Sequence, residues 1–285
     1  DNYADVIVGA PAYNNTLYGQ GKVFVYHGSA SGIGVSPNWV ATATEPDDSK
    51  MGWSVATAGD VNGDRYADII VGAPGYEYYE EDQGAVFIWY GSASGVNEDV
   101  DGTIANADWT FVENSPPGQN GYVVSTAGDV NGDGYSDVFI GTPYAYWDAA
   151  GEGSAYLILG SSTGLLDTLD NYDFGNQANG HFAWSLGSAG DVNGDGFADV
   201  IAGEPDIDGT YSNEGRAYVW YGHSGGISAG NDWNAWGGDD GLRFGISVAT
   251  AGDVNGDGYS EIIIAAQGDD ATLGEVRLFA GGPEP

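Results

Sequence analysis

The sequence predicts an all-β protein with the architecture of a β-propeller, in which four-stranded antiparallel sheets stack face to face as blades. Three observations predict it: a repeat of about 60 residues, many short apolar runs bounded by glycine, and no sustained helical period. The 49 Gly and single Met among 285 residues favour strands and tight turns over helices. Because one four-stranded sheet cannot bury both of its faces, stacked copies are the stable solution.

The repeat is anchored on one motif. Ala58-Gly59-Asp60-Val61-Asn62-Gly63-Asp64 recurs almost unchanged at 127–133, 189–195 and 251–257. Its first Asp falls at 60, 129, 191 and 253, which gives steps of 69, 62 and 62 residues. Residues 1–11 match residues 64–74, so we expect a fifth copy that starts inside its motif, in a chain cut from a longer one. The repeats then run approximately over 1–50, 51–119, 120–180, 181–242 and 243–285, within one propeller that spans 1–285.

Each repeat predicts four strands, named A to D in chain order. Strand A leads into the motif at 54–58, 123–127, 185–189 and 247–251. Strand B follows as a β-branched run, as at 68–72, 137–141 and 199–203, and strand C lies at 21–28, 84–91, 153–160, 215–222 and 274–280. Strand D centres on Trp39, Trp109, Phe174 and Trp233. We expect A and B to line the inner part of each blade and D to lie outside.

Charge and composition exclude several classes of protein. The 6 Lys+Arg against 42 Asp+Glu give a formal net charge of −36, which predicts no nucleic-acid partner, since that surface needs a basic face. Disorder is excluded because 42% of the residues are hydrophobic and 13% aromatic. Cysteine is absent, and no apolar run approaches the roughly 18 residues of a spanning helix, so we expect no direct membrane insertion.

The motif and the triplet that follows strand B resemble the FG-GAP repeat of integrin α-subunit propellers and their bacterial relatives. The triplet stands as Gly72-Ala73-Pro74 and weakens to Gly203-Glu204-Pro205, and the Phe-Gly pair survives only as Phe244-Gly245. Propellers of that family usually have seven blades. The resemblance therefore implies that flanking sequence or another chain completes the propeller.

The nine-residue loop between strands A and B, here called the motif loop, places oxygen ligands at positions 1, 3, 5 and 9 and a backbone carbonyl at position 7. Oxygen ligands rich in carboxylate, without His or Cys, select Ca²⁺ over transition metals and over Mg²⁺. The sequence thus predicts Ca²⁺ as cofactor at four to five sites. The expected ligands are Asp1, Tyr3 and Asp5; Asp60, Asn62, Asp64, Tyr66 and Asp68; Asp129, Asn131, Asp133, Tyr135 and Asp137; Asp191, Asn193, Asp195, Phe197 and Asp199; and Asp253, Asn255, Asp257, Tyr259 and Glu261.

An alternative is that these loops are ordinary Asx-rich turns with solvated carboxylates. Three carboxylates within nine residues repel one another, which favours a bound cation. Glu261 replaces the last Asp in the fifth loop, and the first loop keeps only Asp1, Asp5 and the Tyr3 carbonyl. Position 6 is Gly in three loops and Arg65 in the second, and we expect a positive φ there.

Alternating strands put the motif loops and the C–D turns on one face and the B–C loops on the other. The B–C loops contain eight of the 19 Tyr and one Trp, beside acids such as Glu77, Glu80, Glu81 and Asp148. Exposed aromatics of this kind predict a recognition surface for protein or glycan, unless the rings fold back over the blades. The residues concerned are Tyr13, Tyr18, Tyr76, Tyr78, Tyr79, Tyr144, Tyr146, Trp147 and Tyr211.

These observations predict a calcium-binding propeller that acts outside the cell, secreted or at its surface, as an adhesion, recognition or structural module rather than an enzyme. The alternatives are a non-catalytic part of a larger secreted hydrolase and a propeller lectin. Residues 222–226 match the Gly-x-Ser-x-Gly nucleophile elbow, but no His lies beyond His223. We therefore expect no catalytic residue and a simple C–D turn at that point.

Overall fold

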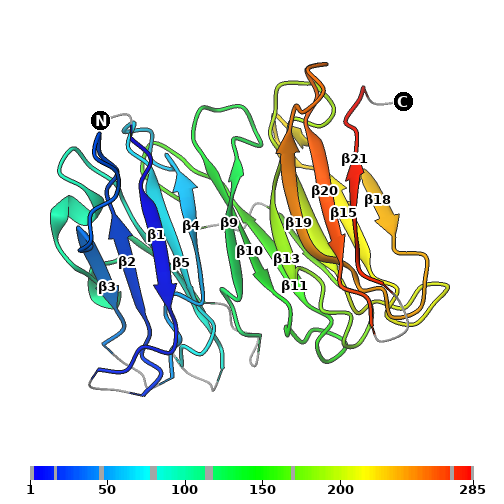
Figure 1. The fold of residues 1–285 in the computed structure, drawn as a ribbon, viewed down its shortest axis with the longest axis horizontal. Helices are drawn as coiled ribbons and strands as arrows, with labels where there is room; N and C mark the ends of the chain where they lie inside the picture. Colours follow the sequence, from blue (N-terminus) through cyan, green and yellow to red (C-terminus); the bar gives the residue numbers. More distant parts are fainter. Residues whose placement is uncertain are drawn as a thin grey trace.

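The structure is a computed structural model that describes residues 3–15, 18–44, 48–77, 82–112, 118–167, 171–269 and 273–283. These residues form five stacked β-sheets and one small two-stranded hairpin (Figure 1). The sheets follow one another along the chain in an open row, with the two termini at opposite ends. Each sheet corresponds to one repeat and is called a blade, numbered first to fifth. The predicted all-β, propeller-type architecture is confirmed.

The second, third and fourth blades each contain the four predicted strands in the order A, B, C, D. The second blade consists of β4 (Ser54–Gly59), β5 (Asp68–Ala73), β6 (Ala85–Trp89) and β8 (Trp109–Phe111). The third consists of β9 (Val123–Gly128), β10 (Asp137–Thr142), β11 (Ser154–Ile158) and β12 (Asn171–Phe174). The fourth consists of β13 (Ser185–Gly190), β14 (Asp199–Glu204), β15 (Arg216–Trp220) and β18 (Trp233–Trp236).

The end blades are built differently. The fifth blade contains β19 (Phe244–Gly252), β20 (Glu261–Ala266) and β21 (Glu275–Phe279). The first contains β1 (Val6–Ala10), β2 (Lys22–Tyr26) and β3 (Trp39–Thr42), and β7 (Gly102–Thr103) pairs with β3 in parallel. β7 comes from the C–D connection of the second repeat, which also contains the short 3₁₀ segments η1 (Val96–Asp99) and η2 (Ile104–Asn106). These three elements were not predicted from the sequence.

The A strands lie innermost, as predicted. β4 contacts β9, β9 contacts β13 and β13 contacts β19, so the A strands of successive blades are neighbours. The B strands β5, β10 and β14 are buried at every position. Alternate residues of β5 face opposite junctions: Ile69 packs between the first and second blades, and Ile70 packs between the second and third. Each junction is thus a two-sided apolar core.

An apolar residue just after each C–D turn packs into the junction with the preceding blade. Val96, Leu165 and Ile227 occupy this position in the second, third and fourth blades, and we call them plug residues. Leu165 is 6% exposed, beside Trp109 and Tyr156. Ile33, at the same position in the first blade, is 53% exposed because no described blade precedes it.

The outward faces of the two end blades expose residues that are buried at the inner junctions. Val8 of β1 is 44% exposed, whereas its equivalent Val71 in β5 is fully buried. Leu278 of β21 is 55% exposed, whereas its equivalent Ile88 in β6 is fully buried. Both end faces therefore have the chemistry of a blade junction.

Leu165→Ala is expected to destabilise the protein by about 2–5 kcal/mol, because it leaves a cavity in a junction core. The matched control is Ile33→Ala, at the same blade position but exposed, which should change stability by less than about 0.5 kcal/mol. Urea unfolding of both variants measures the difference. Equal losses of unfolding free energy in the two variants would contradict the role of the plug residues in the junction core.

Candidate functional site

The second to fifth motif loops each fold around the carboxylate of their first residue. Asp60 accepts hydrogen bonds at Oδ1 from the amides of Gly63 (2.7 Å) and Asp64 (3.0 Å), and at Oδ2 from the amide of Arg65 (2.8 Å). Asp64 in turn accepts from the amide of Tyr66 at 2.9 Å. Asp129, Asp191 and Asp253 make the same bonds in the third, fourth and fifth loops. These Asx turns close the loop locally and hold its oxygen-bearing side chains on one short turn.

The last residue of the loop is a buried carboxylate that connects two turns. Asp68 is fully buried; its Oδ2 accepts from the amide of Val61 at 2.9 Å, and its Oδ1 accepts from the amide of Gly91 at 2.8 Å. Gly91 opens the C–D turn, so this carboxylate fixes the motif loop to that turn. Asp137 and Asp199 are also fully buried and make the equivalent pair of bonds. The prediction that motif loops and C–D turns share one face is confirmed.

Burial makes these carboxylates costly to ionise. Desolvation raises the pKa of Asp68 to about 7, opposed by hydrogen bonds from Gly91 and Val61 and reinforced by the charges of Asp64 and Asp60. The pKa values of Asp137 and Asp199 are raised to about 7 for the same reasons. A cation beside such a group would favour its charged form.

Neighbouring motif loops interlock. The amide of Ser136 donates to the carbonyl of Asp60 at 2.9 Å, and the ring of Tyr135 lies so close to Gly63 that a Cβ there would come within 2.5 Å of it. The same arrangement joins the third loop to the fourth and the fourth to the fifth. The aromatic residue at position 7 thus covers the glycine at position 4 of the preceding loop.

The fifth and first loops depart from this pattern. Glu261 is buried and accepts from the amide of Val254 at 2.7 Å, but its other oxygen accepts from the Asn255 side chain at 3.0 Å. The longer side chain therefore turns back into its own loop. In the first loop Asp5 accepts from the amide of Gly28 at 2.8 Å, Tyr3 is 48% exposed, and Asp1 lies outside the described residues.

The donor chemistry of the motif loops fits a hard cation, since it is entirely oxygen. In the described part of the chain, however, no three His, Asp or Glu side chains are gathered closely enough to hold one metal ion. The loop carboxylates instead accept backbone hydrogen bonds. Binding of an ion would require the side chains at positions 1, 3 and 5 to exchange some of these bonds for the cation.

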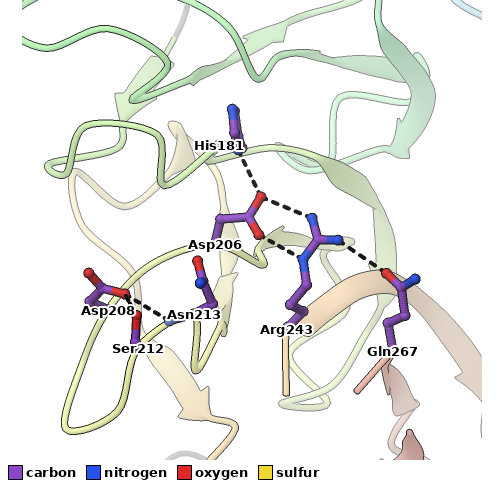
Figure 2. A network of polar contacts seen from close by, with 7 residues as sticks. All are labelled: His181, Asp206, Asp208, Ser212, Asn213, Arg243 and Gln267. Atoms are coloured by element: carbon purple, nitrogen blue, oxygen red, sulfur yellow. Dashed lines mark hydrogen bonds and ion pairs between the residues drawn. The ribbon is translucent and has the colours of Figure 1, made fainter. Parts of the chain in front are cut away.

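The opposite face is formed by the B–C and D–A loops, and a charged network crosses it between the fourth and fifth blades (Figure 2). Asp206 accepts from Arg243 at 2.7 and 3.0 Å and bonds to His181 Nδ1 at 2.8 Å. Arg243 also donates to Gln267 at 3.1 Å. Burial raises the pKa of Asp206, but the hydrogen bonds from His181 and Arg243 outweigh it and leave the pKa lowered. This network ties the loops of two blades together.

The predicted aromatic residues of this face divide into two groups. Tyr18, Tyr146, Trp147 and Tyr211 are between 43% and 73% exposed. Tyr76 instead packs edge-on against Phe87 at 5.6 Å, Tyr144 packs against His181 at 5.1 Å, and Tyr13 lies under the Lys22 ammonium at 5.2 Å. Those three rings are half-buried, as in the alternative that the rings fold back over the blades. Tyr78 and Tyr79, with Glu80 and Glu81, lie outside the described residues.

Two features of this face were missed by the sequence analysis. Glu152 and Glu214, both buried, accept hydrogen bonds from the backbone amides of Trp147 (2.7 Å) and Tyr211 (3.2 Å), and so fix the loop backbone that carries the exposed rings. Trp53, Tyr122 and Trp184, each at the start of an A strand, form a chain of ring contacts at 5.4 and 5.2 Å. The recurrence of an aromatic residue directly before each of these three A strands was the available signal for the second feature.

Stacked four-stranded blades with an Asp-rich loop at one end of each define a β-propeller protein. A model of the FG-GAP repeat matches residues 51–89, 120–158, 182–220 and 244–279, which cover strands A to C of four blades. The chain belongs to the FG-GAP repeat family.

Named relatives fall into two groups. Integrin alpha pat-2 of Caenorhabditis elegans is 30% identical over 220 residues, 71% of this chain and 17% of the relative. Integrin alpha-5 of Xenopus laevis is 30% identical over 251 residues, 85% of this chain and 22% of the relative. Phosphatidylinositol-glycan-specific phospholipase D of Mus musculus is 31% identical over 178 residues, 61% of this chain and 20% of the relative. The chain therefore spans about a fifth of the length of these curated relatives.

The segment with the elbow-like sequence is a hairpin. β16 (Gly222–His223) pairs with β17 (Gly226–Ile227) in the C–D turn of the fourth blade, as expected. Within the described ranges, no helix combines the length and apolar character needed to cross a membrane.

Arg65→Gly is expected to stabilise the protein by about 1 kcal/mol, because Arg65 holds a φ of 75° where the other loops have glycine at 93°. The reciprocal change Gly134→Arg should cost a similar amount, since a Cβ at Gly134 meets open space and only the backbone is strained. Thermal unfolding of both variants measures the two effects. A loss of stability in Arg65→Gly would contradict the argument.

Proposed function

We propose that this chain is a calcium-binding propeller module that recognises a protein or glycan outside the cell. The observation that carries the proposal is the fourfold motif loop, with three carboxylates in nine residues and the last of them buried. The raised pKa values of Asp68, Asp137 and Asp199 support it, because a divalent cation offsets the cost of burying a charged carboxylate. The competing interpretation is that the motif loops are ordinary turns whose carboxylates are neutral or solvated.

The residues that would hold Ca²⁺ are those at positions 1, 3, 5 and 9, with the carbonyl at 7. The second to fifth loops have all of them, and Glu261 supplies the last carboxylate in the fifth. A fifth site in the first loop would rest on Tyr3 and Asp5 and on Asp1. Calcium, when bound, would neutralise the crowded acids and fix the loop, so its role here is structural.

Calcium is expected to raise the melting temperature strongly relative to excess chelator. Each site that binds only the folded state adds about 2.7 kcal/mol at a hundredfold excess of calcium over the dissociation constant. Differential scanning calorimetry in calcium, in magnesium and in chelator measures the effect.

A pair of variants makes this test specific. Asp133→Asn removes one loop carboxylate and should reduce the calcium-dependent gain, whereas Asp148→Asn, an exposed acid outside the loops, should leave it unchanged. A melting temperature that does not respond to calcium would show that the motif loops are only turns.

The recognition surface is proposed on the B–C loop face. Trp147 and Tyr211 are half-exposed, and their backbone amides are bonded to Glu152 and Glu214, so the loop backbone that carries the rings is held in place. Aromatic side chains of this kind give large contact area at low entropic cost. The acids around them favour cationic or hydroxyl-rich partners, with attraction that weakens in salt.

An extracellular location follows from the calcium proposal, because loop sites of this kind suit the millimolar calcium found outside cells. The two named integrin alpha relatives support a role in adhesion. The exposed end faces support completion of the propeller by flanking sequence or by another chain, because they carry the apolar residues of a blade junction.

The similarity to a phospholipase D favours a second function. The chain would then be the non-catalytic propeller of a larger secreted hydrolase, with the same calcium loops and no catalytic residue of its own. A propeller lectin is the third possibility. A protein ligand would indicate an adhesion module, and a glycan ligand would indicate a lectin. A catalytic domain in the same polypeptide would indicate the accessory function.

Trp147→Ala combined with Tyr211→Ala should lower ligand binding by tenfold or more. The probes are a glycan array and an array of extracellular proteins, screened in calcium at low and at physiological salt. The control combines Ser94→Ala with Thr163→Ala, two exposed C–D turn residues on the opposite face, and should bind as the wild type does. Loss in the control alone would place the recognition surface on the motif-loop face.

A further inference from the structure

A small polar pocket lies between the third and fourth blades, away from the motif loops. Its volume is about 120 Å³, and its lining includes Asp173 and Phe174 from β12, Glu204 from β14, Arg216 and Tyr218 from β15, and Asn231. The D–A loop residue Asn176, which is exposed, also lines it and connects it to solvent. The pocket has room for several water molecules or for one small polar group.

Glu204 is the unusual residue of this pocket. It is 1% exposed, its Oε2 accepts a hydrogen bond from the hydroxyl of Tyr218, and its Oε1 has no hydrogen-bond partner among the described residues. A buried polar atom without a partner costs about 1–3 kcal/mol, and more when it belongs to a charged group. A donor in the pocket would remove that cost.

The propeller architecture does not require a carboxylate at this position. The equivalent residues are Ala73, Thr142 and Ala266 in the second, third and fifth blades. In the third blade the polar groups satisfy each other: Thr142 and Ser154 are hydrogen-bonded, and the Ser154 hydroxyl donates to Tyr156 at 3.1 Å. The fourth blade alone places a carboxylate there, and this carboxylate keeps one oxygen unpaired among the described residues.

The charges around the pocket favour a cation. Burial raises the pKa of Glu204 to about 7; the Tyr218 hydrogen bond and the charges of Arg216 and His181 lower it, and the charge of Asp173 raises it. Burial also raises the pKa of Asp173. The Arg216 guanidinium also lines the pocket, but it lies over the rings of Tyr218 (4.5 Å) and Trp236 (4.7 Å) and donates to Asn234 at 3.2 Å. The pocket lining therefore contains two carboxylates, those of Glu204 and Asp173, and one cation, Arg216, which already has other contacts.

We propose that this pocket binds a primary ammonium group, whose N–H donors pair with Glu204 and Asp173. A metal ion is disfavoured, because Ca²⁺ requires six to eight oxygen ligands and the pocket offers few beside an arginine. An ammonium group has three donors on a compact charge and fits the volume. The site is independent of the motif loops, so it stands or falls separately from the calcium proposal.

The ammonium group has two sources, a free small amine or a lysine side chain. Methylammonium represents the first source, and the peptide acetyl-Gly-Lys-Gly-amide represents the second. Tetramethylammonium, which carries the same charge without N–H donors, and potassium chloride at equal ionic strength are the reference solutes. All measurements are made at pH 8 in constant calcium, so that Glu204 is ionised and the motif loops stay in one state.

Calorimetric titration should show saturable methylammonium binding, lost at least tenfold in Glu204→Gln and in Glu204→Ala. Glu204→Ala introduces the residue that the second and fifth blades have at this position, so the blade is expected to tolerate it. Asp148→Asn should bind as the wild type does. Tighter binding of the lysine peptide than of methylammonium would identify a protein partner as the source of the ammonium group. Tighter binding of methylammonium would identify a free amine as the source.

A second measurement follows Glu204 itself by carbon-13 NMR of its carboxyl group. Methylammonium should lower the pH midpoint of this signal, because a bound cation favours the charged form, and its affinity should fall as the pH drops below about 7. Equal effects of tetramethylammonium and methylammonium, or unchanged binding in Glu204→Ala, would overturn the proposal.

Discussion

The blade depends on one buried carboxylate. Asp68, and its equivalents Asp137 and Asp199, sits at the first position of strand B and accepts amide hydrogen bonds from two separate turns. The motif loop and the C–D turn are far apart in sequence, and this group brings them to one end of the blade. Its burial is costly, as the raised pKa values indicate, and that cost connects the architecture of the blade to the proposed calcium sites.

Contacts between blades reuse a small set of positions. The aromatic residue at position 7 of one motif loop covers the glycine at position 4 of the preceding loop. A plug residue such as Leu165 packs into the junction between the same two blades. Each blade therefore completes the core of its predecessor. A blade without a neighbour keeps an apolar face in solvent, as Val8 and Leu278 do.

Differences between the repeats are concentrated where the fold places least demand on sequence. The B–C loops of the first four blades have one length but vary in composition, and Glu152 and Glu214 accept the same backbone amide bonds in two of them. At the end of strand B the equivalent residues are Ala73, Thr142 and Glu204, and only the last leaves an oxygen unpaired in the described chain. Variation of this kind on a constant framework is where recognition is expected to reside.

The repeat, the main strands and the motif loops could be predicted from the sequence, because each is set by local patterns: β-branched runs between glycines and alternating Asx side chains within nine residues. The sequence did not predict β7, which reaches the first blade from the second repeat, nor that Tyr76 packs onto Phe87 while Trp147 stays half-exposed. The Glu204 oxygen that lacks a partner in the described part of the chain and the Trp53–Tyr122–Trp184 contacts likewise depend on the tertiary structure. The physical reason is that these features depend on which surfaces meet across a blade junction, and residues that meet there are separated by a whole repeat of chain.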